Sequence, residues 1–263
     1  MCIRDRLLAL FIVGCGPSGW QPSGSIFLDD VTPIGMGVID QNLWISDGDN
    51  NRVVVVTKSG EKVKTLDEIE RPMHLDVIEG VAYVPSYGSD DILMINGDII
   101  DTLQVDVELD APAGVSVVGD HIAIADFYNN QVAIYNGSSW KKIGKKGRGP
   151  LEFNYPTDVQ ILNDKIFVAD AYNNRIQVLD LDGNHLKTIG DDQGLNAATG
   201  VYTDGTDIYI TDFENDRILI FDMEGKLIQM MDQGLNKPTD LIIEEGKLYV
   251  ANYKGKYISI YEK

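Results

Sequence analysis

The chain repeats itself six times with a period of about 40 residues, and this repeat constrains its fold more than any other feature. The repeats align on an anchor position, occupied in turn by Asp47, Ser86, Asp126, Asp170, Asp212 and Asn252, with spacings of 39, 40, 44, 42 and 40 residues. Fourteen residues before each anchor lies Pro33, Pro72, Pro112, Pro156, Ala198 or Pro238. Repeats of this length, made of short β-runs without helical periodicity, predict one four-stranded antiparallel sheet each.

Apolar residues recur in register with the anchors. The positions two before and six after the anchor hold only β-branched residues, which suit a pleated sheet: Ile45, Val84, Ile124, Val168, Ile210 and Val250, then Val53, Ile92, Val132, Ile176, Ile218 and Ile258. We therefore predict an all-β fold, a six-bladed β-propeller that occupies residues 25–263.

Turn residues divide each repeat into strands. In the fourth repeat they predict strands at 158–162, 165–169, 175–180 and 185–188, with a turn at 170–174 in which Asn adopts the left-handed conformation. The sixth repeat reaches Lys263 after only three strands, whereas residues 25–29 (SIFLD) form a spare strand before the first repeat. We expect the spare strand to complete the sixth blade and close the ring, because closure removes two exposed sheet edges.

The N-terminal residues resemble the leader of a bacterial lipoprotein. Arg4 and Arg6 precede an apolar run, Leu7–Val13, which is too short to span a bilayer, and Ile12–Cys15 (IVGC) is similar to a lipobox. The resemblance implies a signal peptide at 1–14, a lipid on Cys15 and a flexible tether at 15–24. It places the protein in the cell envelope, anchored to a bacterial membrane and facing the periplasm or the exterior. The alternative is a buried N-terminal helix with a chance cysteine.

Charge and cysteine content exclude several kinds of function. With 41 acidic against 22 basic residues, the formal net charge is −19, so we expect no nucleic-acid partner. The cysteines are Cys2 and Cys15, which leaves the repeats without a disulfide, a cysteine metal site or a cysteine nucleophile. The sequence also lacks a nucleophile elbow, HExxH and a Walker loop, so we expect a binding protein rather than an enzyme. We also expect the protein to be a monomer.

Two stretches resemble NHL-repeat propellers. Residues 147–156 (GRGPLEFNYP) and 168–183 (VADAYNNRIQVLDLDG) are similar to the linkers and turns of that family, and the likeness extends over 32–263. Together with the lipobox, this resembles six-bladed propeller lipoproteins of Bacteroidota. The resemblance implies the fold but no single function, because the architecture also occurs in sensors, scaffolds, lyases and lactonases.

The polar group Asp170, Asn173, Asn174 and Arg175 looks at first like a catalytic cluster. It recurs as Asp47, Asn50, Asn51 and Arg52, and nearly so as Asp212, Asn215, Asp216 and Arg217. A catalytic cluster is not needed three times around a ring. We interpret the group as part of the scaffold, with Asp and Asn closing the turn and Arg pairing within or between blades.

The residues two after the proline position alternate between Gly and a possible metal ligand: Gly35, His74, Gly114, Asp158, Gly200 and Asp240. One His and two carboxylates could bind a divalent cation, Ca²⁺ or Zn²⁺, near the axis. We expect instead that no cofactor is bound, that each Asp caps a local turn and that His74 is a stray polar residue; the metal site is the alternative. Amidating lyases of this architecture bind zinc through a His directly after the proline, and none of the six equivalent residues here is His. A metal-dependent hydrolase or lyase, similar to the lactonases, is therefore the alternative function.

Aromatic residues follow the anchors in five of the six repeats: Tyr87, Phe127, Tyr128, Tyr172, Phe213 and Tyr253. We expect them on one face, here called the top face, where aromatic rings can bind a protein, peptide or glycan. The alternative is that they pack between blades. A basic run, Lys141 to Arg148, predicts either contact with an acidic partner or membrane, or a solvated loop.

Overall fold

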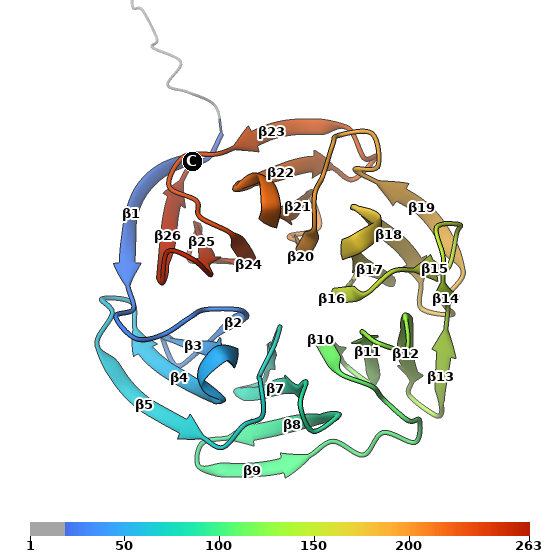
Figure 1. Cartoon of the computed structure of the whole chain (residues 1–263), viewed down its shortest axis with the longest axis horizontal. Helices are drawn as coiled ribbons and strands as arrows, with labels where there is room; N and C mark the ends of the chain where they lie inside the picture. The colour runs from blue at the N-terminus through green and yellow to red at the C-terminus, as the bar shows by residue number, and fades with distance from the viewer. Residues whose placement is uncertain (1–18) are drawn as a thin grey trace, which may run out of the picture.

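The computed structural model describes residues 19–263, which form a ring of six four-stranded antiparallel blades around a central axis (Figure 1). The predicted all-β propeller is confirmed. The helices in this part of the chain are short 3₁₀ turns, and none has the length and apolar character needed to cross a membrane. The predicted signal peptide and Cys15 lie outside the described residues.

Chain order runs outward from the axis in the first five blades. The first three blades are β2 (Met36–Ile39), β3 (Asn42–Asp47), β4 (Arg52–Thr57) and β5 (Lys62–Asp67); β6 (Asp76–Ile78), β7 (Val81–Ser86), β8 (Asp91–Asn96) and β9 (Ile99–Thr102); and β10 (Pro112–Val118), β11 (His121–Asp126), β12 (Gln131–Asn136) and β13 (Trp140–Ile143). A parallel pair, β14 (Lys145–Lys146) and β15 (Glu152–Phe153), leads into blade four.

The remaining blades follow the same plan. They are β16 (Pro156–Leu162), β17 (Lys165–Asp170), β18 (Arg175–Asp180) and β19 (His185–Ile189); β20 (Ala198–Thr203), β21 (Asp207–Asp212), β22 (Arg217–Asp222) and β23 (Leu227–Met231); and β24 (Pro238–Glu244), β25 (Lys247–Asn252), β26 (Tyr257–Glu262) and β1 (Gln21–Phe27). The strand bounds predicted for blade four are within two residues of those observed.

Strand β1 closes the ring as predicted, although it lies at 21–27 rather than 25–29. It pairs antiparallel with β26, with Gln21 opposite Glu262 and Phe27 opposite Tyr257. The strand includes Pro22 and Gly24, which an outer edge strand tolerates. Residues 21–24 therefore belong to blade six instead of the expected tether.

The tether is shortened further by Trp20, which is buried between blades five and six. Its indole N–H donates to the Tyr209 hydroxyl at 3.3 Å, and its backbone N–H donates to Gln229. It joins an apolar cluster with Met231 and Tyr261.

The repeating apolar positions form the core between blades. All twelve β-branched residues two before and six after the anchors are fully buried, at 0% exposure. Because they occur on the same two strands of every blade, adjacent blades pack face to face around the whole ring.

The turn between the second and third strands of a blade is built by the repeated polar group. The buried Asp170 carboxylate accepts hydrogen bonds from Asn154 N–H at 2.7 Å and Arg175 Nε at 2.9 Å. Asn174 has a φ of 59°, in the left-handed region, as predicted. Blades one and five repeat the arrangement, with Arg52 and Arg217 bound to Asp47 and Asp212. The arginine pairs within its own blade and also binds backbone carbonyls of the preceding loop.

The strand directions define two faces of the ring. Pro112, at the start of β10, pairs with Asp126 at the end of β11, so the first strand of a blade begins beside the turn between its second and third strands. These turns form the top face. Because Gln21 pairs with the last residue of β26, the chain enters β1 from the opposite, bottom face.

Candidate functional site

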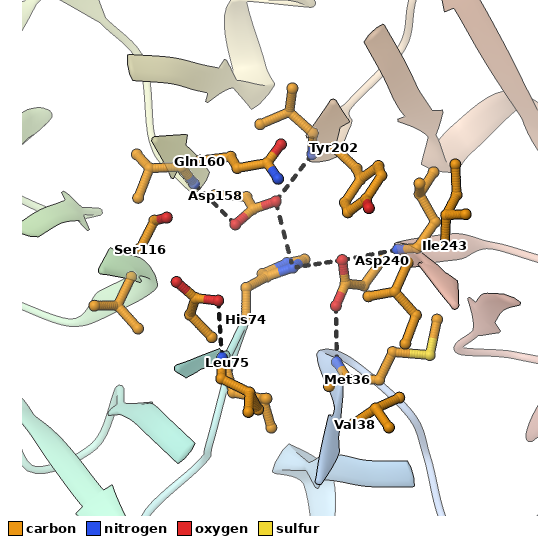
Figure 2. Close-up of a pocket in the computed structure, with 18 of the residues that line it drawn as sticks. Met36, Val38, His74, Leu75, Ser116, Asp158, Gln160, Tyr202, Asp240 and Ile243 are labelled. Carbon is orange, nitrogen blue, oxygen red and sulfur yellow. Dashed lines mark hydrogen bonds and ion pairs between the residues drawn. The ribbon is translucent and has the colours of Figure 1, made fainter. Parts of the chain in front are cut away.

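Three ionisable side chains from alternate blades converge on the axis (Figure 2). His74 Nδ1 lies 4.0 Å from Asp158 Oδ2 and 3.9 Å from Asp240 Oδ1, and all three side chains are buried. One ligand atom from each residue lies within 4.8 Å of the others. The structure therefore brings together the three residues that the sequence suggested as metal ligands. We call them the axial triad.

The glycines of the odd blades make this convergence sterically feasible. A Cβ on Gly114 would lie 2.7 Å from Asp158 Cα, and a Cβ on Gly35 would lie 2.7 Å from His74 Cα. On Gly200 it would lie 2.4 Å from the Thr239 carbonyl oxygen. Real Cβ atoms do not approach so closely, so each Gly lets the next blade bring its polar side chain inward. The alternation in the sequence thus has a packing cause and gives the axis a threefold pattern.

The two carboxylates are held by backbone N–H groups of their own and the next blade. Asp158 accepts from Val159 at 2.8 Å and from Val201 at 2.9 Å. Asp240 accepts from Leu241 at 2.8 Å and from Met36 at 2.7 Å. Each carboxylate therefore links two blades, and its orientation is fixed before anything binds.

His74 is held less completely, because its buried Nδ1 has no hydrogen-bond partner among the described residues. Burial raises the pKa of Asp158 to about 7, against the opposing charge of His74. Burial alone would lower the pKa of His74, but the neighbouring Asp158 and Asp240 carboxylates raise it overall. The triad therefore retains protons near neutral pH when it has no other positive charge.

A cavity of about 220 Å³ adjoins the triad. Ser116, Gln160 and Tyr202 line its walls, and it extends along the inner strands as far as Glu244, at the bottom end of β24. The cavity thus opens away from the top face, where we expected the aromatic residues. The repeat places the triad near the top ends of the inner strands, but the open volume lies on the other side of it.

A fourth ionisable residue, Asp76, lies in the wall of this cavity. Its carboxylate accepts from Val77 N–H and Val117 N–H, both at 2.8 Å. Burial raises its pKa. None of the described residues that line the cavity is Lys or Arg, so its carboxylates face only the His74 imidazole.

The predicted top-face aromatics form two groups rather than one rim. The larger group, here called the aromatic cluster, consists of Tyr87, Phe127, Tyr128, Tyr155 and Tyr172 from blades two to four. Successive ring centroids are 4.8–5.7 Å apart. Tyr128 and Tyr172 expose 51% and 58% of their surface, and the other three are half-buried.

Tyr155 was missed in the sequence because it precedes its proline instead of following an anchor. It stacks on Phe127 at 4.8 Å and meets Tyr172 at 5.1 Å, so it joins blades three and four. The other two predicted rings, Phe213 and Tyr253, pair with each other at 6.0 Å, and the Tyr253 hydroxyl donates to Asp49.

The basic run is mostly part of the scaffold. Lys142 Nζ donates to the Glu108 carbonyl oxygen, and Lys145 pairs with Glu152 at 3.2 Å. Lys146 lies over the Tyr155 ring, 5.2 Å from its centroid, at the edge of the aromatic cluster. The run is therefore not a simple loop: Lys141 and Lys142 belong to the outer strand β13, and Lys145 and Lys146 form β14 between blades three and four.

Comparisons with known proteins support the fold. Residues 102–198 match a family model described as a six-bladed β-propeller, and no match was found among curated proteins. Virginiamycin B lyase from Staphylococcus aureus is 11% identical to this chain, with a TM-score of 0.68. The match covers 93% of this chain and 100% of the lyase chain. A streptogramin B lyase is 13% identical, with a TM-score of 0.66, and the match covers 92% of this chain and 97% of the lyase chain. The WD40 propeller domain of Doa1 is 10% identical, with a TM-score of 0.70, and the match covers 94% of this chain and 98% of the Doa1 domain. At such identities the likeness establishes architecture alone.

Proposed function

We propose that this chain is a lipid-anchored protein of the bacterial cell envelope, similar to NHL-repeat lipoproteins, that binds a protein or peptide through its top face. The observation that carries the proposal is the aromatic cluster, in which five rings from three blades form one continuous surface. Tyrosine rings supply large contact areas at a low entropy cost, and they are enriched at binding interfaces. We expect the protein to act as a monomer.

The arrangement of the rings favours a polypeptide over a glycan. Sugars stack on flat, open ring faces, but most rings in the cluster meet at interplanar angles of 59–83° and cover one another. Arg71 covers another face, 4.9 Å from the Tyr87 centroid. The cluster therefore combines rings in mixed orientations with hydroxyl groups and two nearby cations, Arg71 and Lys146, a combination that suits backbone carbonyls and apolar side chains.

The path of the chain supports an anchor that leaves this surface free. The chain enters β1 from the bottom face, and the aromatic cluster lies on the top face. A tether from Cys15 would then hold the bottom face toward the membrane. Binding would occur on the side away from the bilayer.

The test is capture of the envelope partner by full-length protein carrying Tyr128→Ala and Tyr172→Ala. These are the most exposed rings of the cluster, so we expect loss of the partner without a change in Tm. Phe27→Ala is the matched control, because Phe27 is also an exposed aromatic, at 71%, but lies on the outer strand β1. Capture of the same partner at wild-type level by the double variant would refute the proposal, and displacement by oligosaccharide alone would favour a glycan.

The anchor is tested separately. Cys15→Ser should move the protein from the membrane fraction to the soluble fraction, because lipidation requires the thiol. Unchanged partitioning into membranes would show that the IVGC sequence is not used as a lipobox.

A further inference from the structure

We propose that the axial triad is a binding site for one divalent transition-metal cation of the zinc class, with His74 Nδ1, Asp158 and Asp240 as its protein ligands. The site is independent of the proposed partner surface, because it lies inside the ring and adjoins a cavity that extends toward the bottom face.

The separations among the three groups suit ligands of a common ion better than direct partners. A hydrogen bond between an imidazole N–H and a carboxylate would bring the atoms to about 2.7–2.9 Å, but the observed distances are 3.9 and 4.0 Å. Tetrahedral zinc, with bonds of about 2.0–2.2 Å, separates its ligand atoms by roughly 3.4 Å. A movement of about half an ångström by each side chain would therefore produce metal-binding distances.

The hydrogen bonds around the axial triad leave one nitrogen of His74 and lone pairs of both carboxylates free to bind a metal ion. Both carboxylates are oriented by two backbone N–H groups each, an arrangement that fixes ligands in metal sites, and their oxygens keep further lone pairs. His74 is 96% buried, and its Nδ1 has no hydrogen-bond partner among the described residues. The unpartnered imidazole nitrogen thus points to a ligand between the two carboxylates.

The charge of the cavity lining favours a cation. Asp76, Asp158, Asp240 and Glu244 line the same cavity, and among the described residues that line it His74 is the only basic one. A divalent ion would neutralise the two carboxylates that bind it. An imidazole ligand favours Zn²⁺ or a similar transition metal over Ca²⁺, which takes oxygen ligands. The cavity has room for water as a further ligand.

The experiment is calorimetric titration of the full-length protein, first treated with chelator, with ZnCl₂ alone. We expect about one Zn²⁺ per chain and a Tm that rises with zinc. His74→Phe removes the nitrogen ligand without leaving a buried polar group, and it should weaken zinc binding by at least tenfold. His185→Phe is the matched control, because His185 lies at the start of the outer strand β19, away from the cavity, and zinc binding should be unchanged.

A second variant and a second probe keep the test decisive if His74→Phe does not fold. Asp158→Asn preserves side-chain volume and should also weaken zinc binding at least tenfold. Co²⁺ in place of zinc should give the visible absorption of a tetrahedral site in the wild type and in His185→Phe only. A wild type that binds no zinc, a variant of either triad residue that binds it normally, or binding of Ca²⁺ in preference to zinc would overturn the proposal.

Discussion

Replacement of Gly114 by alanine tests whether the odd-blade glycines set the spacing of the ring. The added Cβ would lie 2.7 Å from Asp158 Cα, 2.9 Å from Thr157 O and 3.0 Å from Asp158 Oδ1. Two of these atoms belong to the backbone of β16 and cannot rotate away, so blades three and four must separate. Overpacking of this kind costs about 1–3 kcal/mol, and backbone contacts place Gly114→Ala near the upper value.

The expected effect is readily measured by thermal denaturation followed by circular dichroism. For a domain of this size, about 3 kcal/mol lowers the Tm by roughly 6–12 °C. Gly24→Ala is the matched control, because Gly24 also lies in a strand but its Cβ would meet no atom within 4 Å. We expect its Tm to stay within about 3 °C of the wild type. A Gly114→Ala protein as stable as Gly24→Ala would refute the packing explanation of the alternation.

Three further predictions concern buried partners. Arg175→Gln should destabilise the protein by about 2–4 kcal/mol in urea unfolding, because it removes the charge that pairs with the fully buried Asp170. In blade three the equivalent pair is Asp126 with Gln131, and burial raises the pKa of Asp126. Because the pKa of Asp126 is higher in the folded than in the unfolded protein, this carboxyl lowers the free energy of unfolding as the pH rises above its unfolded-state pKa. Gln131→Arg should therefore stabilise the protein by about 1 kcal/mol at pH 7. The gain should disappear near pH 3, where Asp126 becomes protonated. Trp20→Ala should cost about 3–5 kcal/mol in the same assay, because the residue packs against the ring.

Each of these predictions has an outcome that contradicts it. Arg175→Gln should be compared with Arg148→Gln, an exposed arginine in the preceding loop, and equal stability of the two variants would mean that the buried pair contributes little. A gain from Gln131→Arg that is the same at both pH values would show that it does not arise from Asp126. A neutral Trp20→Ala would place Trp20 in the tether.

The sequence was sufficient for the architecture because each blade carries the same local information. The anchors and β-branched positions recur at fixed offsets, so blade number, strand order and the closing strand follow from the repeat. Even the axial triad was found, because its three residues occupy equivalent positions in alternate repeats.

Features that depend on contacts between distant residues were not predicted. Trp20 packs on Tyr209, 189 residues away, and no local pattern links the two. Tyr155 joins the aromatic cluster through a backbone with a φ of 55°, which no sequence rule assigns to a tyrosine before proline. The direction of the cavity depends on which side chains fill the axis below the triad, and the repeat leaves those positions variable.

The pairing of β1 with β26 also determines when folding can finish. Gln21 and Glu262, which face each other in that pairing, are 241 residues apart, so β1 stays without its partner until the whole ring sequence is available. Contacts of such high sequence separation form late, and the cost of closing the loop is met only when both edges are ready. Until then, the edge of β1 is exposed to other chains. An unpaired strand edge of this kind favours association between incompletely folded chains, so the last pairing of the ring also ends the period in which the chain is most prone to aggregate.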